Sequence, residues 1–328
     1  MDTLLDLNIP IIIFIQNLGS WLGAPLQFFT FLGDEEFYLL IMPLLYWCID
    51  AGLGFRLGVV LLIGGSLNST LKVFFHSPRP YWYSTRVLAL NEGTAFGFPS
   101  GHSQNAASLW GLAAVYIKRR WAWITAIVVI FFIGISRIYV GVHFPIDVLV
   151  GWALGALFLW LFLKVEKPIK IWVKEQSLGA QIGLCLGISV LIILAGILSK
   201  ACLGSWQVPQ IWFTNAISEI DPLSLEGFFT TAGTFFGIGA GAVIFSHFKG
   251  SLDVSGSLFQ RILRYVLGLV VVIGIYAGLK VLFLEGSTPL ALGLRFIRYG
   301  LVGLWISWGG PLVFQRLKLL PSSASPNT

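Results

Sequence analysis

Charged side chains are scarce in this sequence. Only 11% of its 328 residues are Asp, Glu, Lys or Arg, whereas soluble domains carry roughly 25%. Hydrophobic residues make up 56%, and the mean hydropathy is +0.84. This balance excludes an ordinary soluble domain and predicts an integral membrane protein. The net charge of +6 does not indicate nucleic-acid binding, because the basic residues lie in short loops between apolar runs.

Cysteine is also scarce, and its three positions form no pattern. Cys48, Cys185 and Cys202 lie in or beside apolar runs, so we predict neither a disulfide framework nor a metal site from them. The N-terminus lacks the basic stretch of a cleavable signal peptide. The acidic cluster at residues 34–36 has no His or Cys partner, and we interpret it as a solvated turn.

Long apolar runs dominate the rest of the chain and predict an all-α, polytopic membrane helix bundle, since a span needs about 20 mostly apolar residues. The region 9–32 is interrupted by glycines and Pro25, so it either spans the membrane or lies along its interface. A basic connector at 164–174 separates two sets of spans. The expected spans are residues 37–49, 55–75, 102–117, 121–140 and 146–163, followed by 178–198, 228–246, 262–283 and a weaker one at 296–314.

The loops indicate an orientation. If the spans alternate, one face carries most of the Lys and Arg residues, which marks it as cytoplasmic. The longer loop at 201–226, with Trp206, Trp212 and Phe213, belongs to the other face, and its aromatic residues suit the headgroup level. Two glycine pairs, Gly151 with Gly155 and Gly237 with Gly241, predict close helix packing.

Three polar segments reach that same outer face. They are residues 72–80, at the end of one span, 99–102, at the start of the next, and 136–147, where one span ends and another begins. Ionisable side chains in membrane-spanning sequence are costly and mark functional sites by default. A snorkelling Arg and an interfacial His could explain the third segment alone. They do not explain three such segments at one depth.

The residue types in these segments suit a phosphate group. Lys72, Arg79 and Arg137 supply three cations, and Arg forks match phosphate oxygens. Ser100 is expected near the N-cap of a helix whose free N–H groups bind anions. Gly101 would let an oxyanion approach the backbone closely.

Two histidines suit a two-step transfer of that phosphate. One would attack phosphorus, and the other would protonate the leaving oxygen. Asp147 lies four residues after His143 and could accept the proton of its remote ring nitrogen. The other histidine is His102. Pro145, between His143 and Asp147, fits the first turn of a helix that begins at that point.

The three segments together resemble the signature of the type 2 phosphatidic acid phosphatase (PAP2) superfamily, which also holds vanadium haloperoxidases and glucose-6-phosphatase. The matching residues are Lys72-x6-Arg79-Pro80, then Pro99-Ser100-Gly101-His102, then Ser136-Arg137-x5-His143-x3-Asp147. The resemblance covers residues 34–166. The length and the extra spans are more weakly similar to sphingosine-phosphate phosphatases.

The resemblance implies a six-helix PAP2-type core with about four additional C-terminal transmembrane helices. We expect an N-terminal helix at 1–32, a catalytic core at 33–166, the additional helices at 167–320 and a disordered tail at 321–328. It implies that His143 is the nucleophile that forms a phosphohistidine, that Asp147 orients it and that His102 is the general acid. The phosphate would be held by Lys72, Arg79, Ser100, Gly101 and Arg137, with no metal and no cofactor.

The function that follows is hydrolysis of a lipid phosphate or pyrophosphate at the outer membrane face, in a bacterial inner membrane. The same residues would serve a phosphotransferase that passes the phosphate to an acceptor lipid or sugar. A non-catalytic lipid-binding or transport protein would not need the paired histidines, and a haloperoxidase is disfavoured by the membrane character. The identity of the lipid and the oligomeric state stay open.

Several other residues have competing interpretations. Arg295 and Arg298 could bind a headgroup, but snorkelling is the preferred explanation. His76 is interpreted as an interfacial helix-end residue and His247 as solvated. For the loop residues Trp82, Tyr83 and Arg86, substrate contact and an aromatic belt remain equal alternatives.

Overall fold

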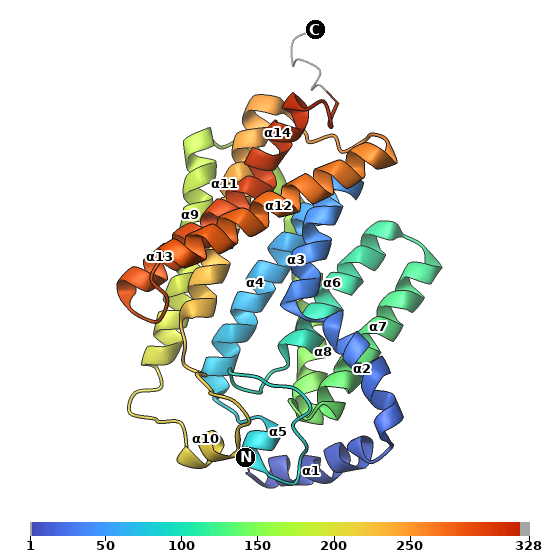
Figure 1. Cartoon of the computed structure of the whole chain (residues 1–328), viewed down its shortest axis with the longest axis vertical. Helices are drawn as coiled ribbons and strands as arrows, with labels where there is room; N and C mark the ends of the chain where they lie inside the picture. The colour runs from blue at the N-terminus through green and yellow to red at the C-terminus, as the bar shows by residue number, and fades with distance from the viewer. Residues whose placement is uncertain (1, 322–328) are drawn as a thin grey trace. The chain divides into compact units, whose positions relative to one another are not determined.

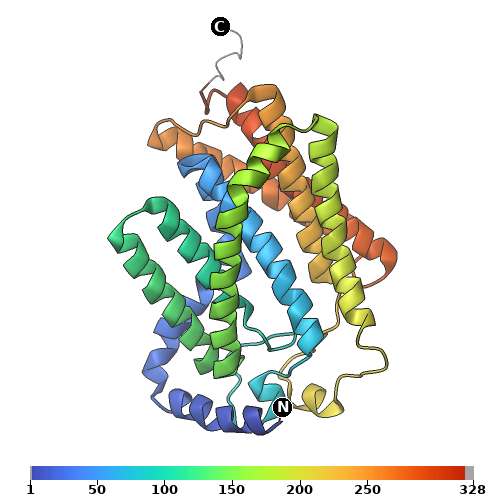
Figure 2. The same ribbon diagram turned by 180° about the vertical axis from the view of Figure 1, so that it is seen from behind.

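Helices account for all the regular structure in the part of the chain that the computed structural model describes (Figures 1 and 2). That part is residues 2–321, without the side chains of residues 2–4, 35 and 36. Seven helices are long and apolar enough to cross a membrane, or eight if a bent pair near the N-terminus counts as one span. The all-α polytopic prediction is therefore confirmed, whereas the tail predicted at 321–328 lies outside the described residues after Pro321.

The helices follow the predicted spans closely, and their bounds are as follows. The first set is α1 (Asp2–Gln16), α2 (Gly23–Phe31), α3 (Glu35–Leu44), α4 (Ala51–Phe75), α5 (Pro80–Tyr83), α6 (Gly101–Ile117), α7 (Arg120–Tyr139) and α8 (Pro145–Lys174). The second set is α9 (Leu178–Ala201), α10 (Gln210–Asn215), α11 (Glu226–Lys249), α12 (Leu258–Leu282), α13 (Pro289–Leu304) and α14 (Gly310–Arg316). A 3-10 turn at Ser20–Leu22 precedes α2, and π-helical turns follow α3 and α13.

The N-terminal region is a bent pair of helices. Its two arms, Leu5–Gln16 and Ser20–Phe31, meet at 88°, which Figure 1 shows as a corner between α1 and α2. Gly19 lies at the bend with φ of 125°, a conformation that favours glycine. The region is therefore not a single straight span.

Two boundaries differ from the expectation by at least seven residues for reasons visible in the sequence. The basic connector at 164–174 is helical and forms the last turns of α8, since its Lys and Glu residues are good helix formers. The weak last span begins earlier than predicted, at Pro289. Thr288 caps that helix by accepting a hydrogen bond from the Ala291 N–H, and Pro289 occupies its first turn.

The chain divides into two compact units. The first comprises residues 1–38, 63–163 and 196–224, and the second comprises 39–62, 164–195 and 225–328. In the first unit, α6 and α7 form an antiparallel pair that is clear in both views (Figures 1 and 2). α8 packs closely on α6, because a Cβ at Gly151 would lie 2.6 Å from the Ser100 carbonyl oxygen and one at Gly155 would lie 2.3 Å from that of Gln104. The packing predicted from this glycine pair is confirmed.

The second unit is built around α11 and α13. A Cβ at Gly237 would lie 2.0 Å from the Gly300 carbonyl oxygen, so the second glycine pair also marks a close helix contact, as predicted. Beside this pair, Trp47 packs edge to face on Phe314 at 5.5 Å between ring centroids. Its indole N–H donates to the Ile306 carbonyl oxygen at 2.8 Å, which satisfies the polar atom of a buried aromatic residue.

Candidate active site

The first unit brings the three polar segments together at the ends of α4, α6, α7 and α8. Two backbone groups join the second and third segments, since the Ser100 N–H donates to the Asp147 carbonyl oxygen at 3.0 Å. The Arg79 guanidinium donates through Nη1 to the Val142 carbonyl oxygen at 3.3 Å, which joins the first and third. Residues that are far apart in the sequence thus form one site.

Lys72 and Arg79 are fixed by backbone carbonyl groups of the loop before α6. The Lys72 ammonium group donates to the carbonyl oxygens of Phe96 and Gly97. Arg79 donates through Nε to the Ala95 carbonyl oxygen at 2.8 Å, and its guanidinium lies 5.7 Å from the ring centroid of Trp82. Arg79 is only 7% exposed. Both cations are therefore preorganised by the fold.

The N-terminus of α6 has the predicted capping residue. Ser100 is the N-cap, and its hydroxyl accepts from the Ser103 N–H. A Cβ at Gly101 would lie 2.9 Å from Oδ1 of Asn68, so no larger residue fits without a shift. Asn68 itself is 4% exposed and donates to Gln104 Oε1 at 3.0 Å. The sequence analysis did not assign Asn68 to the site, although a buried polar residue within a span was a signal for it.

His143 and Asp147 form a buried pair. Nδ1 of His143 lies 3.3 Å from Oδ2 of Asp147, and the two side chains are 2% and 1% exposed. The same carboxylate oxygen accepts from the Phe144 N–H at 2.9 Å, which fixes its position. Because Nδ1 faces the carboxylate, Nε2 is the nitrogen left for a substrate.

Burial is the main reason that the pKa of His143 lies well below its ordinary value. Positive charges nearby act in the same direction, and they belong to Lys72, Arg79, Arg137 and, when protonated, His102. The imidazole ring is therefore neutral at pH 7, as a nucleophile must be.

Arg137 carries donors without acceptors. The side chain is 4% exposed, and its Nε and Nη1 atoms have no hydrogen-bond partner. Leaving such groups unpaired in a buried position is costly, and more so for a charged group. The Arg137 carbonyl oxygen accepts from the N–H groups of Val142 and His143, which holds the guanidinium and the imidazole on one turn. An anion at this position would satisfy the open donors.

His102 has a partner that the sequence analysis missed. Its Nε2 lies 2.8 Å from Oδ1 of Asp34. The interpretation of the acidic cluster as a solvated turn is therefore wrong for Asp34, whose carboxylate is only 30% exposed and bound to the site. No spacing rule links residues 68 positions apart, so no local pattern indicates this pair. Nearby, Thr30 donates to the hydroxyl of Ser136 at 2.9 Å.

The tryptophans of the loop at 201–226 pack on other aromatic rings of the first unit, and their expected place at the headgroup level stays a prediction. Trp212 is 9% exposed, and its ring lies 6.1 Å from that of Trp82, which is fully buried. Trp206 packs on His76 at 4.7 Å between ring centroids, so His76 contacts protein rather than lipid alone. These indole rings have large apolar surfaces, which packing on one another removes from water. Phe213 stays exposed.

The remaining candidates lie outside this cluster. Tyr83 donates through its hydroxyl to Asp6 at 2.9 Å, whereas Arg86 and His247 are exposed. Both arginines on α13 have acidic partners, and the snorkelling interpretation stays a prediction. Arg295 forms an ion pair with Glu226, and Arg298 pairs with Glu285 at 3.5 Å and lies over the rings of Tyr276 and Tyr299.

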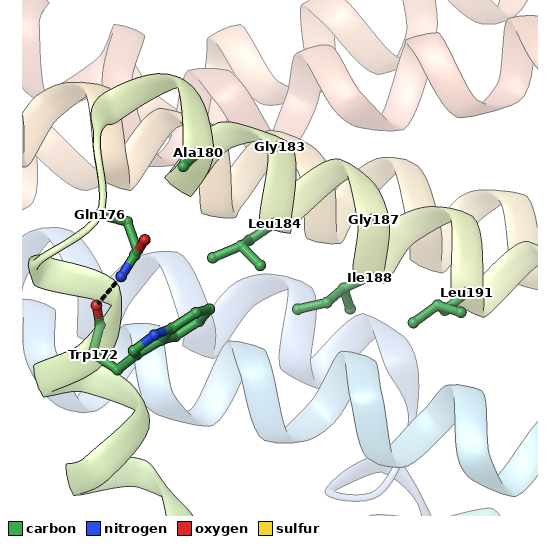
Figure 3. A pocket seen from close by; sticks show the side chains of 8 residues that line it. All are labelled: Trp172, Gln176, Ala180, Gly183, Leu184, Gly187, Ile188 and Leu191. Atoms are coloured by element: carbon green, nitrogen blue, oxygen red, sulfur yellow. Dashed lines mark hydrogen bonds between the residues drawn. The ribbon is translucent and has the colours of Figure 1, made fainter.

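An apolar groove of about 610 Å³ lies elsewhere, in the second unit, along the N-terminal half of α9 (Figure 3). Trp172 and Gln176 close one end of it, where the Gln176 side chain donates to the Trp172 carbonyl oxygen at 3.1 Å. None of the predicted site residues lines it. Among the described residues, no three His, Cys, Asp or Glu side chains are grouped so that they could hold a metal ion.

Comparison with known proteins gives two family matches. Residues 53–170 match the PAP2 superfamily, and residues 229–324 match the transmembrane extension of PAP2 superfamily phosphatases. The first match contains every residue of the predicted signature, from Lys72 to Asp147.

Individual relatives are phosphatases. Phosphatidylglycerophosphatase B of Bacillus subtilis is 33% identical over 46% of this chain and 78% of its own length. Undecaprenyl-diphosphatase of Sulfolobus acidocaldarius is 30% identical over 39% of this chain and 62% of its own. Human sphingosine-1-phosphate phosphatase 2 is 29% identical over 41% of this chain and 35% of its own length. This match confirms the weaker resemblance to sphingosine-phosphate phosphatases. The chain thus spans less than two thirds of the latter two proteins.

One solved structure is similar over part of the chain. The crystal structure of a transmembrane PAP2 type phosphatidylglycerolphosphate phosphatase from Bacillus subtilis aligns with a TM-score of 0.41 and 28% identity. The alignment covers 49% of this chain and 86% of that one.

Proposed function

Because this chain belongs to the PAP2 superfamily, we propose that it is a multi-pass membrane phosphatase that hydrolyses a lipid phosphate or pyrophosphate through a phosphohistidine. The observation that carries the proposal is the buried guanidinium of Arg137, which has two donor atoms without partners and shares a turn with His143. A phosphate group is an anion that fits those donors. The relatives named above act on phosphorylated or pyrophosphorylated lipids by their names.

The first chemical step is attack of His143 Nε2 on phosphorus. A bond forms between nitrogen and phosphorus while the bond from phosphorus to the leaving oxygen breaks. The Asp147 carboxylate holds the proton on Nδ1 and stabilises the positive charge that develops on the ring. His102 gives its proton to the leaving oxygen, so that oxygen carries no negative charge when it departs. The leaving group is the lipid alcohol from a phosphate and the lipid monophosphate from a pyrophosphate.

The second step is hydrolysis of the phosphohistidine. His102, now neutral, takes a proton from water, and the water oxygen attacks phosphorus. The phosphorus–nitrogen bond then breaks, inorganic phosphate leaves, and both histidines return to their starting states. Microscopic reversibility assigns the acid and base roles to one residue.

Three cations and a helix N-terminus would stabilise the charge on the transferring group. Lys72, Arg79 and Arg137 act as the clamp, and we expect the Ser100 hydroxyl and the Gly101 N–H, at the start of α6, to contact the same anion. These fixed charges supply the neutralisation that a metal ion supplies in other phosphatases. We therefore expect turnover without added divalent metal.

The location of the site follows from the distribution of basic residues. The loop that carries Lys118, Arg119 and Arg120 is more basic than those at the site end of the spans, once the three clamp residues are set aside. Excess Lys and Arg mark the cytoplasmic side. We therefore place the site on the extracytoplasmic side of a bacterial inner membrane, where a headgroup can reach it while its acyl chains stay in lipid.

The test is phosphate release by the purified protein in detergent with EDTA. Phosphatidate, phosphatidylglycerol phosphate, a sphingoid phosphate and a prenyl pyrophosphate form the substrate panel, and orthovanadate should inhibit. His143→Ala should lose activity by at least roughly a thousandfold, because it removes the nucleophile, while its thermal unfolding stays like that of the parent. His247→Ala is the matched control and should keep full activity. A folded, active His143→Ala protein would exclude the proposed nucleophile.

The same assay separates hydrolysis from phosphotransfer. A phosphotransferase uses the same phosphohistidine but needs an acceptor alcohol, so it releases little free phosphate until one is added. Acceptor-dependent turnover would assign the chain to that class. A binding or transport protein would bind the lipid phosphate and turn over none of the panel.

A further inference from the structure

We propose that Asp34 is a positioning residue for His102. In the proposed phosphatase, each of the two histidines would then be oriented by a hydrogen bond to a carboxylate. The inference rests on the proposed function, because it assigns a part in proton transfer to the group that protonates the leaving oxygen. Its basis is the 2.8 Å contact between Asp34 Oδ1 and His102 Nε2. Asp34 lies outside the three segments of the signature and before the matched residues 53–170.

The turn that carries Asp34 is built against the histidine. It lies between α2 and α3, and the N–H groups of Gly33 and Asp34 are used within it by the carbonyl oxygens of Thr30 and Phe31. A Cβ at Gly33 would lie 2.8 Å from Cδ2 of His102, so the backbone approaches the ring edge as closely as a glycine permits. The contact is therefore a property of the packed turn and not of one mobile side chain.

The exposure of the pair argues for a role in chemistry over a role in folding. The His102 and Asp34 side chains are 25% and 30% exposed. Partly exposed ion pairs contribute little to folding stability. Orienting an imidazole, in contrast, requires only that one hydrogen bond select its tautomer and ring position.

The contact determines which ring nitrogen of His102 bonds the carboxylate and which one is free for the substrate. A carboxylate only accepts hydrogen bonds, so the proton shared with Asp34 lies on Nε2. Nδ1 is then the atom that gives and takes the proton of the leaving oxygen. His143 uses the opposite arrangement, because its Nδ1 faces Asp147 and its Nε2 is free. The two rings therefore present different nitrogens to a substrate.

The charges around His102 explain why a carboxylate is useful there. Burial opposes protonation of the ring most strongly, and two cations, Arg137 from the end of α7 and Lys72 from α4, act in the same direction. His143, from the turn after α7, interacts with it as well. Asp34 is the acidic group that acts on His102 in the favourable direction. A general acid has to be protonated when the substrate arrives, and Asp34 offsets part of the repulsion from the cations.

The experiment compares Asp34→Asn with the parent on two substrates. With a lipid phosphate, whose alkoxide leaves poorly, kcat should fall roughly 10- to 100-fold with little change in KM, since general acid catalysis contributes about 10²- to 10⁴-fold. With p-nitrophenyl phosphate, whose leaving group needs no proton, the loss should be less than about threefold. The high-pH limb of kcat/KM, where His102 loses its proton, should move to lower pH by about one unit.

Two further variants complete the test. Asp34→Glu keeps the negative charge. It should restore part of kcat and return the high-pH limb of kcat/KM toward its position in the parent. Asp6→Asn is the matched control, because Asp6 also bonds a side chain of the first unit, the Tyr83 hydroxyl, but has no place in the site. It should behave like the parent.

The outcomes are distinguishable. Equal losses on both substrates with an unmoved pH limb would show that Asp34 only supports the structure, and an Asp34→Asn protein as active as the parent would overturn the inference outright. Neither result would affect the proposed function, which is tested separately by phosphate release from the parent and by His143→Ala.

Discussion

Buried arginines have two different roles in this molecule, and the difference lies in their hydrogen bonds. Arg137 is 4% exposed and leaves Nε and Nη1 without partners. Arg264 is fully buried and also leaves Nη1 without a partner, but its Nη2 donates to the carbonyl oxygens of Val254 and Ser255, at 3.0 and 3.3 Å. The first arginine has donors that remain open for a ligand. The second holds the loop before α12.

This contrast predicts opposite effects of the same substitution. Arg137→Met should reduce activity by roughly a hundredfold or more, because it removes one charged clamp from the transition state. It should leave the unfolding temperature unchanged or raised, since an unpaired buried charge is lost with it. Arg264→Met should keep activity and lower the unfolding temperature, because hydrogen bonds from a charged group are each worth about 1.5–3 kcal/mol.

The measurement is phosphate release and thermal unfolding in the same detergent for both variants. Arg137→Lys adds a check on geometry, since an ammonium group cannot form the two-pronged contact of a guanidinium. Full activity in Arg137→Met would remove Arg137 from the proposed clamp.

At the residue scale, sequence spacing predicts contacts between site residues that are close in the chain. It does not predict contacts between residues that only packing brings together. His143 lies in the turn just before α8 and Asp147 in the first turn of that helix, so a separation of four residues keeps the two side chains close. Asp34 reaches His102, and Asn68 reaches Gly101, only because separate helices pack side by side. No local pattern encodes such contacts.

Among the secondary-structure elements, α10 has the clearest unexpected role. It lies in the loop predicted to be polar and packs on α5, whose N-cap is Arg79. Two contacts join them. Trp212 lies on Trp82, and Asn215 donates through Nδ2 to the Trp82 carbonyl oxygen at 3.0 Å. Since Arg79 lies over the same indole ring, α10 supports one cation of the clamp indirectly.

Trp212→Ala should therefore weaken both stability and turnover. Loss of a buried Trp side chain costs roughly 3–5 kcal/mol. A small displacement of Arg79 should lower kcat/KM roughly 10- to 100-fold, because positioning errors near 1 Å have effects of that order. Phe213→Ala is the matched control, since Phe213 is the next residue on α10 and is 43% exposed. If the two variants lost activity equally, support of Arg79 by α10 would be excluded.

Periodicity and turn residues located most helices correctly, and the misses have physical causes. The bend between α1 and α2 could not be predicted from hydropathy, because both arms are apolar. The basic residues that end α8 have the charge of a connector but the helix propensity of a helix end, and in the structure they are helical. The type of the Trp residues before α11 predicts an interface but not their partners, which are other aromatic rings.

At the scale of the whole molecule, the two compact units are not contiguous in the sequence. Each contains segments from both ends of the predicted catalytic core and from the C-terminal helices. The sequence divisions at 32, 166 and 320 remain predictions about how the chain is organised. The C-terminal match to a PAP2 transmembrane extension shows that the additional helices are a family feature, which their apolar composition alone did not reveal.

The orientation in the membrane can be tested with a cysteine that the chain already has. Cys202 follows α9 and is exposed. The loop it begins continues into α10, which packs on α5 beside Arg79, so Cys202 lies on the same membrane side as the proposed site. Cys48 is buried, and Cys185 lies within α9, where lipid shields it. A membrane-impermeant maleimide added to intact spheroplasts should therefore label the parent protein at Cys202.

The matched control moves that thiol to the opposite loop. In Cys202→Ser with Arg119→Cys, the new thiol replaces an exposed basic residue between α6 and α7. It should react only after the membrane is permeabilised, because that loop belongs to the side richer in Lys and Arg. Labelling of Arg119→Cys in intact spheroplasts, with Cys202 protected, would invert the orientation. The proposed substrate would then be a lipid phosphate of the inner leaflet, while the residues that act on it would stay the same.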